Sequence, residues 1–232
     1  MIRKYCSLLC LLICILHANS QEVEKITVKS GDDVSTVLSS YGMYRFPAFT
    51  DGMVWFKGGN NAAGKMNYNI YLGLIQFIDA KGDTLAVSNP ETIDSVTIGD
   101  NLFYYKEGYL QVVATYANCK LVMQQKIEFL PVKVGAMGVQ SNGTGAQTYE
   151  SMSSSFTINK RLVFNEDIVV LKKTSYLLFY KKYRHEAANK RGFLAAFPDY
   201  KVQIQSFIDG NKTDFTKIED LKKLAAFCSN LQ

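Results

Sequence analysis

The sequence comes closest to a phosphate-binding motif at residues 58–66, which read GGNNAAGKM. Counted from Gly59, the spacing is G-x-x-x-x-G-K, as in loops that hold nucleotide phosphates between a strand and a helix. Met66 stands where such a loop needs a Ser or Thr hydroxyl for Mg²⁺, and the pattern that follows is typical of a strand. Without a helix, no dipole favours the phosphate. We therefore interpret residues 58–64 as a hairpin turn and predict a strand over residues 65–72.

A second motif-like stretch, residues 185–189, reads HEAAN and resembles the zinc-binding helix H-E-x-x-H. Asn189 replaces the second histidine, and a zinc site usually has three protein ligands beside an open position. A His/Glu pair with a distant carboxylate remains an alternative, but we interpret the stretch as a polar loop. His185 is the single histidine after residue 17, which leaves few ways to build a Ser-His-Asp or Cys-His centre.

Basic residues are densest between residues 160 and 191, where nine of them face three acids and aromatic side chains are interspersed. Such a segment suits an acidic component of a cell envelope, namely a lipid head group, a glycan or an acidic protein. The alternative is a hairpin with a merely solvated basic face. Nucleic acid is not an expected partner outside the cell. The candidate residues for binding a partner are Lys172, Lys173, Lys181, Lys182, Arg184, Lys190 and Arg191.

Polar and aromatic side chains also alternate with apolar ones along residues 65–72. This period of two predicts a strand with one buried face and one wetter face. The wetter face and a later run would together form an aromatic surface suited to binding. Its expected members are Asn67, Asn69, Tyr71, Tyr104, Tyr105 and Tyr109.

The N-terminal residues have the pattern of a secretory signal peptide. Arg3 and Lys4 precede an apolar run over residues 6–16, and small residues precede a cleavage position between Ser20 and Gln21. The run is shorter than the roughly 20 apolar residues of a membrane span, and no later run is long enough. Cleavage would leave 24 basic side chains against 21 acidic ones, a net charge of +3. We expect a periplasmic or secreted protein without a transmembrane span.

Two cysteines, Cys119 and Cys228, would remain after cleavage. Two cysteines do not make a disulfide framework, so we expect buried free thiols, with a single disulfide as the alternative in an oxidising compartment. Lipid attachment at Cys10 or Cys14 is disfavoured, because bulky residues precede both cysteines where a small one is needed.

The elements that would position these residues are mainly strands. From residue 52 to 131, short runs rich in β-branched and aromatic residues are separated by turn signals such as Lys81-Gly82-Asp83. Connections this short predict antiparallel neighbours. We expect about six to eight strands. The expected divisions are a signal peptide over 1–20, an antiparallel β domain over 21–134, a flexible Gly/Ser-rich loop over 135–155, a basic β-hairpin region packed on the sheet over 156–192 and a helical appendage over 193–232.

Helical patterns are short. Residues 32–39 have a helical apolar stripe that Asp32 or Asp33 could cap. Near the C-terminus, apolar residues recur with helical spacing over 200–208 and again over 218–228, which predicts two helices packed on each other and on the sheet.

The stretches YRFPAFTDGMVWFKGG and GKMNYNIYLGLIQFIDAKGDTLAVSNPETI, with the closing FPDYKVQIQSFIDGNKTDFTKIEDLKKLAAF, form a distinctive string. In it the chain resembles a group of uncharacterised secreted or periplasmic proteins of the Bacteroidetes. The resemblance implies a periplasmic or surface location and carries no known activity. Bacteria of this group attach sugars at Asp-Ser/Thr-apolar sites, and Asp83-Thr84-Leu85 and Asp94-Ser95-Val96 match that pattern. The alternative is that both are ordinary turn and strand residues.

These patterns predict a mainly β fold of the α+β class, a curved antiparallel β-meander with a short two-helix C-terminal appendage. They predict a non-catalytic binding or assembly module at the bacterial cell envelope, with no catalytic residue, metal or cofactor. Two alternatives stay open. One is a histidine-poor hydrolase that uses carboxylates on the sheet, and the other is a carrier with a large apolar cavity in a curved sheet.

Overall fold

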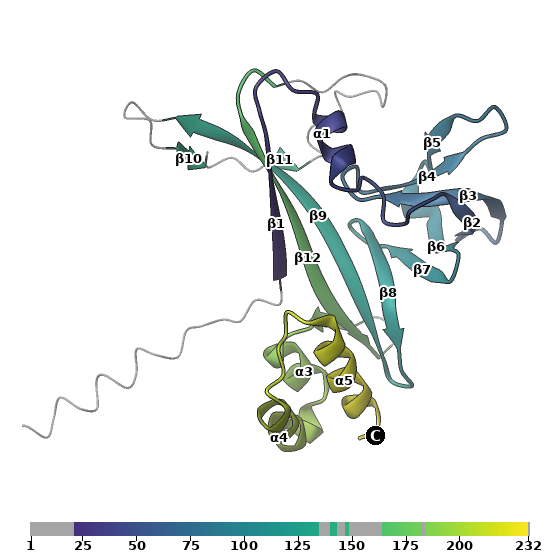
Figure 1. Cartoon of the computed structure of the whole chain (residues 1–232). Helices are drawn as coiled ribbons and strands as arrows, with labels where there is room; N and C mark the ends of the chain where they lie inside the picture. The colour runs from purple at the N-terminus through teal and green to yellow at the C-terminus, as the bar shows by residue number, and fades with distance from the viewer. Residues whose placement is uncertain (1–20, 135–139, 143–146, 149–163, 182–183, 232) are drawn as a thin grey trace, which may run out of the picture.

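The computed structural model describes residues 21–134, 140–142, 147–148, 164–181 and 184–231 (Figure 1). The predicted signal peptide at residues 1–20 lies outside these ranges. Within them, thirteen strands form one open antiparallel sheet, and helices follow near the C-terminus. The predicted fold class, a mainly antiparallel β-sheet with C-terminal helices, is therefore confirmed. No helix of the described residues is long and apolar enough to cross a membrane.

The sheet is ordered β1-β12-β9-β8-β7-β6-β2-β3-β4-β5, with β10 and β11 on β9 and β13 on β12. Two runs, β2 to β5 and β6 to β9, are true meanders, but β2 joins β6, and β12 returns to lie between β1 and β9. The strands are β1 (Gln21–Val28), β2 (Thr50–Phe56), β3 (Asn61–Asn69), β4 (Leu74–Ile78), β5 (Thr84–Ala86), β6 (Ile93–Ile98), β7 (Asn101–Tyr105), β8 (Tyr109–Thr115), β9 (Cys119–Val134), β10 (Gln140–Asn142), β11 (Gln147–Thr148), β12 (Ile168–Tyr180) and β13 (Arg184–Ala187). The helices are α1 (Val34–Ser40), α3 (Lys190–Ala196), α4 (Lys201–Asn211) and α5 (Ile218–Ser229), with 3₁₀ turns η1 (Pro90–Thr92) and η2 (Pro198–Tyr200).

Two hydrophobic cores lie along the long strands β9 and β12. Near one end, Cys119, Leu121 and Met123 of β9 pack with the C-terminal helices. Farther along, Ile127 and Phe129 of the same strand pack with α1 and the β2–β7 part of the sheet. These five residues alternate along β9 and so share one face of it. Figure 1 shows α3, α4 and α5 grouped at one end of β9 and β12, with α1 toward the other.

The helices predicted over residues 32–39, 200–208 and 218–228 are present, and a further short helix, α3, precedes the last two. The Asp33 side chain accepts a hydrogen bond from Ser35 N at 3.0 Å and caps α1. Asn189 caps α3 by accepting a hydrogen bond from Gly192 N at 2.9 Å.

Three local interpretations of motif-like or loop segments change. His185 and Glu186 lie in strand β13, so residues 185–189 are a strand followed by a helix cap, not a polar loop. In the phosphate-loop-like stretch, β3 begins at Asn61, so the turn is shorter than predicted and Gly64 pairs with Gly52 inside the sheet. Within residues 135–155, where a flexible loop was expected, the described residues form the short strands β10 and β11.

The prediction of a wetter face along β3 is wrong. Asn67 and Asn69 are each only 1% exposed, and Tyr71 is 3% exposed. The loop before β2 covers Asn67, whose Nδ2 donates to Phe46 O at 2.9 Å and to Ala48 O at 3.1 Å. Its Oδ1 accepts from Phe46 N at 3.2 Å. Asn69 Nδ2 donates to Gln76 Oε1, and its Oδ1 accepts from Leu72 N. The polar residues of β3 therefore serve as hydrogen-bonding partners inside the protein and do not face water.

Asn67 should therefore be a stability hot spot. We expect Asn67→Ala to lower the free energy of unfolding by about 3 kcal/mol, because a buried side chain is removed and the backbone N–H and C=O of Phe46 lose their partner. Asn61→Ala, at the exposed start of the same strand, is the matched control and should change it by less than about 0.5 kcal/mol. Urea unfolding followed by circular dichroism measures both. Equal losses in the two variants would contradict the role of the buried amide.

Candidate functional site

A pocket opens where the pairing of β8 with β9 stops. The β8–β9 ladder reaches Leu110 and Gln124, and on the same edge of β9 the strand β11 first pairs at Glu128. Gln125, Lys126 and Ile127 thus have no strand partner on that side among the described residues, and they line a cavity of about 170 Å³. We call this cavity the tyrosine pocket. Its lining residues are Tyr68, Ile70, Tyr71, Leu72, Gly73, Leu74, Tyr105, Glu107, Gly108, Tyr109, Gln124, Gln125, Lys126 and Ile127.

Two tight connections bring the four tyrosines together. The β3–β4 turn carries Tyr71 beside the last residues of β3, and the β7–β8 turn joins Tyr105 to Tyr109. Residues 107 and 108 of that turn have φ of +49° and +114°, which lets the chain reverse within three residues. The rings of Tyr68 and Tyr109 lie 6.0 Å apart, and those of Tyr105 and Tyr109 lie 5.1 Å apart. Both pairs are edge-to-face, so they fix each other's orientation.

Buried polar atoms without a hydrogen-bonding partner lie on residues that line the pocket. In the part of the chain that the structure describes, three buried side-chain atoms make no hydrogen bond, namely the hydroxyls of Tyr71 and Tyr109 and Oε1 of Gln125. All three belong to residues that line the tyrosine pocket. Leaving a buried polar group unpaired costs about 1–3 kcal/mol, and most such groups in proteins are satisfied. Their gathering around one cavity indicates polar atoms that a bound molecule or water would satisfy.

Burial also fixes the protonation state of the tyrosines. It raises the pKa of both Tyr68 and Tyr109 above the ordinary value of 10.0, because the phenolate would lose its hydration. The pKa of Tyr71 is raised for the same reason, with Glu24 adding to the effect. The hydroxyls therefore stay protonated and can both donate and accept hydrogen bonds.

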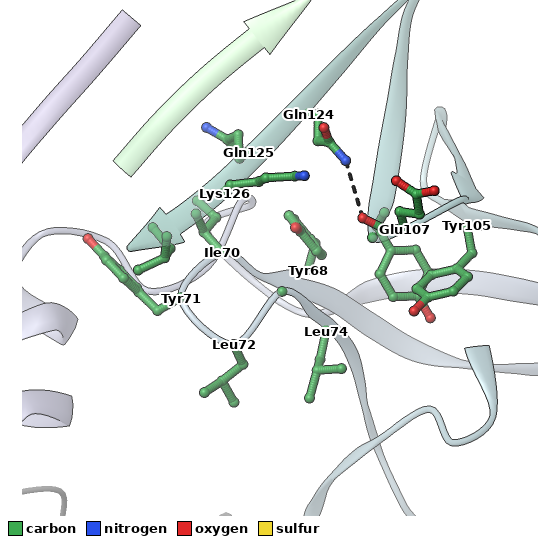
Figure 2. A pocket seen from close by; sticks show the side chains of 14 residues that line it. Tyr68, Ile70, Tyr71, Leu72, Leu74, Tyr105, Glu107, Gln124, Gln125 and Lys126 are labelled. Carbon is green, nitrogen blue, oxygen red and sulfur yellow. Dashed lines mark hydrogen bonds between the residues drawn. The ribbon is translucent and has the colours of Figure 1, made fainter. Parts of the chain in front are cut away.

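Figure 2 shows the polar side chains of β9 on one side of the pocket. Lys126 reaches across it, with its ammonium end toward Tyr68 and Gln124. Gln124 Nε2 donates to Glu107 O at 3.4 Å, a long hydrogen bond that leaves the amide available. Leu72 and Leu74 extend away from these polar groups (Figure 2) and add an apolar wall.

The structure separates the candidate basic residues into two lysines that are paired with acids and others that are exposed. Two of its lysines are compensated within the sheet: Lys172 Nζ lies 2.7 Å from Glu24 and Lys173 Nζ lies 2.6 Å from Glu128. Because each lysine faces an acid on a neighbouring strand, these two charges are not available as part of a patch. Lys182 falls outside the described residues.

The remaining candidates are exposed. Lys181 follows β12, Arg184 begins β13, and Lys190 and Arg191 begin α3. None of the four has a carboxylate of a described residue within 4.0 Å. We call these four residues the basic hairpin surface. His185 lies beside it, stacked on Phe179 with 5.2 Å between ring centres.

Other chemistry-bearing residues occur in structural settings. Cys119 and Cys228 are free and buried in the core around the C-terminal helices. Burial raises the pKa of Cys119 to about 11 and that of Cys228 to about 12, so both thiols are unreactive near neutral pH. No group of three or more His, Cys, Asp or Glu side chains among the described residues is placed to hold a metal ion.

Comparison of the chain with protein-family models, with curated proteins and with solved structures finds no match. The resemblance to secreted Bacteroidetes proteins thus stays a prediction, and the site must be argued from its geometry. Sequence reasoning named three of the pocket's tyrosines but missed Gln124, Gln125 and Lys126. The signal was present: these three polar residues are consecutive, whereas the other charged residues of β9 stand singly between apolar ones.

The buried tyrosines should make the fold sensitive to alkali. Because their pKa values are higher in the folded state than in the unfolded state, their contribution is complete below pH 10.0 and is lost as the pH rises above it. We expect the free energy of unfolding to fall above pH 10. In Tyr109→Phe, the fall should be shallower by up to about 1.4 kcal/mol per pH unit.

Urea unfolding at about pH 8, 10 and 11 measures this slope, and each protein at about pH 8 serves as its own reference. Parallel curves for the wild type and Tyr109→Phe would contradict the burial of a protonated hydroxyl.

Proposed function

We propose that this protein is a non-catalytic binding module of the bacterial cell envelope and that the tyrosine pocket holds its ligand. The observation that carries the proposal is the gathering of the unpartnered buried polar atoms around this cavity. Rigid aromatic walls with a few placed hydrogen-bonding groups are typical of ligand sites. The signal-peptide pattern and the resemblance support the location.

The size of the pocket favours a compact ligand. Pockets for drug-sized molecules measure roughly 300–1,000 Å³, whereas this one measures about 170 Å³. A single sugar ring or a similar polar group suits it better than an acyl chain, which weakens the carrier alternative. Aromatic faces would pack on the ring, while hydroxyl and amide groups would bind its periphery.

The chemistry of the pocket favours binding over hydrolysis. A glycosidase needs two carboxyl groups, roughly 5–10 Å apart. Glu107 is the single carboxylate among the described residues that line the pocket. The histidine-poor hydrolase is therefore the less supported alternative.

The basic hairpin surface supports a second, electrostatic contact with an acidic component of the envelope. Its exposed bases can attract a lipid head group, an anionic glycan or an acidic protein, and steer the module toward it. Because Lys172 and Lys173 are compensated within the sheet, this contact would involve the turn after β12 and the start of α3.

Removing hydrogen-bonding groups without changing the shape of the pocket tests the first part. A twelve-atom sugar at about −0.3 kcal/mol per atom binds with a Kd of roughly millimolar order, which ligand-observed NMR detects. We expect the wild type to bind at least one sugar from a panel of monosaccharides. Tyr68→Phe combined with Gln124→Met should weaken that binding about tenfold or more.

The matched control is Tyr200→Phe with Gln205→Met, the same chemical change on the C-terminal helices. If no sugar binds, or if both double variants bind equally, the pocket is not the ligand site.

Charge reversal tests the second part. We expect Lys181→Glu with Arg184→Glu to weaken co-sedimentation with phosphatidylglycerol vesicles, or retention on an acidic glycan column, by about tenfold or more. The reason is that each base near an anionic surface contributes about 1 kcal/mol. The control Lys201→Glu with Lys212→Glu makes the same change of net charge at exposed positions on and just after α4. Identical behaviour of the two variants would rule out a specific role for the hairpin.

A further inference from the structure

We infer that the tyrosine pocket selects an acidic sugar, a ring that bears a carboxylate, and that Lys126 is the counter-ion of that carboxylate. The inference rests on the proposed function of the pocket as a ligand site and goes beyond it by naming the ligand chemistry. Three independent features of the pocket carry it: an uncompensated charge, a set of hydrogen-bond donors, and an arrangement that suits a ring with hydroxyls.

The charge of Lys126 is left uncompensated by its neighbours. In the β9–β12 ladder, Lys126 lies directly opposite Lys173, so the two side chains project from the same face of the sheet. Like charges in directly opposite positions are unfavourable. Glu128 compensates Lys173, with its two carboxylate oxygens 2.6 Å and 2.7 Å from Nζ. No carboxylate of a described residue lies within 4.0 Å of the Lys126 ammonium.

Hydrogen-bond donors surround the same space. In Figure 2 the Lys126 ammonium points toward the side chains of Gln124 and Tyr68. The single side-chain hydrogen bond of Gln124 Nε2 is the long one to Glu107 O, and no described residue bonds the Tyr68 hydroxyl. An ammonium, an amide N–H and a phenol O–H together suit a carboxylate, which accepts hydrogen bonds only.

The rest of the pocket discriminates among anions. Gln125 Oε1 is an unpartnered acceptor, so it suits a donor such as a sugar hydroxyl, which acetate lacks. The tyrosine rings and Leu72 offer apolar surface that a small inorganic anion cannot use. The Glu107 carboxylate lies beyond Gln124 from Lys126 in Figure 2. The Lys126 end therefore suits the acid group, and the Glu107 end suits the ring hydroxyls.

The test compares glucuronate, glucose, acetate and inorganic phosphate as ligands at constant ionic strength, by ligand-observed NMR titration. Lys126 is exposed, and its ammonium end lies at the pocket. We expect the wild type to bind glucuronate at least about tenfold more tightly than glucose, acetate or phosphate, because one charge-assisted hydrogen bond is gained in addition to the contacts of the ring. Lys126→Met should abolish this preference, so that glucuronate binds no more tightly than glucose. Lys25→Met, which removes an exposed lysine from β1, is the matched control and should keep the preference.

The outcomes separate this inference from the proposed function. Equal binding of glucuronate and glucose by the wild type, or a preference that survives in Lys126→Met, overturns the acidic-sugar inference while the pocket remains a ligand site. Acetate or phosphate binding as tightly as glucuronate also overturns it. No sugar binding at all overturns both. The melting temperatures of both variants, measured in parallel, establish that each protein is folded.

Discussion

The structure depends on the antiparallel ladder between β9 and β12, which pairs thirteen residues of each strand from Ile168 and Pro131 to Tyr180 and Cys119. These two strands carry the rest of the sheet on their outer edges. β1 and β13 share one edge of β12, β8 and β11 share one edge of β9, and β10 pairs with the last residues of β9. Both hydrophobic cores also lie on this ladder, so a shift of its register by one residue would turn both sets of apolar side chains away from their partners.

Between the two cores, the face of the ladder becomes polar at Gln125 and Thr174. These residues are directly opposite each other, and Gln125 Nε2 donates to Thr174 Oγ1 at 3.4 Å. The break coincides with the place where β8 stops pairing, so a cavity forms where neither core fills the space. The unpaired polar atoms around this cavity lower the free energy of unfolding. Such a cost is common at binding sites, where residues serve a ligand and not the packing of the core. The fold thus explains why the pocket lies at this point and not inside either core.

Particular residues show which structural features the sequence patterns could predict and which they could not. The period of two predicted a strand over residues 65–72. It was correct for residues 65–69, because alternation follows from backbone geometry, but residues 70–73 form the turn to β4. The same alternation led to the prediction that Asn67 is exposed to solvent. Alternation alone cannot distinguish a face that meets solvent from one that a loop covers. Lys172 and Lys173 were grouped with exposed bases for a similar reason. Their acids, Glu24 and Glu128, come from strands far away in the sequence. Three of the four tyrosines that line the pocket were predicted as part of an aromatic surface, but the pocket itself was not, since its other wall comes from the middle of β9.

The sequence by itself determined the antiparallel β class, the short capped helix after β1 and the helical C-terminus. These follow from local periodicity, turn residues and caps, which depend on neighbours within a few positions. Tertiary structure decided which strands pair, which polar residues are buried and which lysines stay uncompensated. Each of these depends on contacts between distant segments. Lys126 illustrates the division: its place on a strand is readable locally, but only the pairing with β12 sets Lys173 opposite it and Glu128 against Lys173.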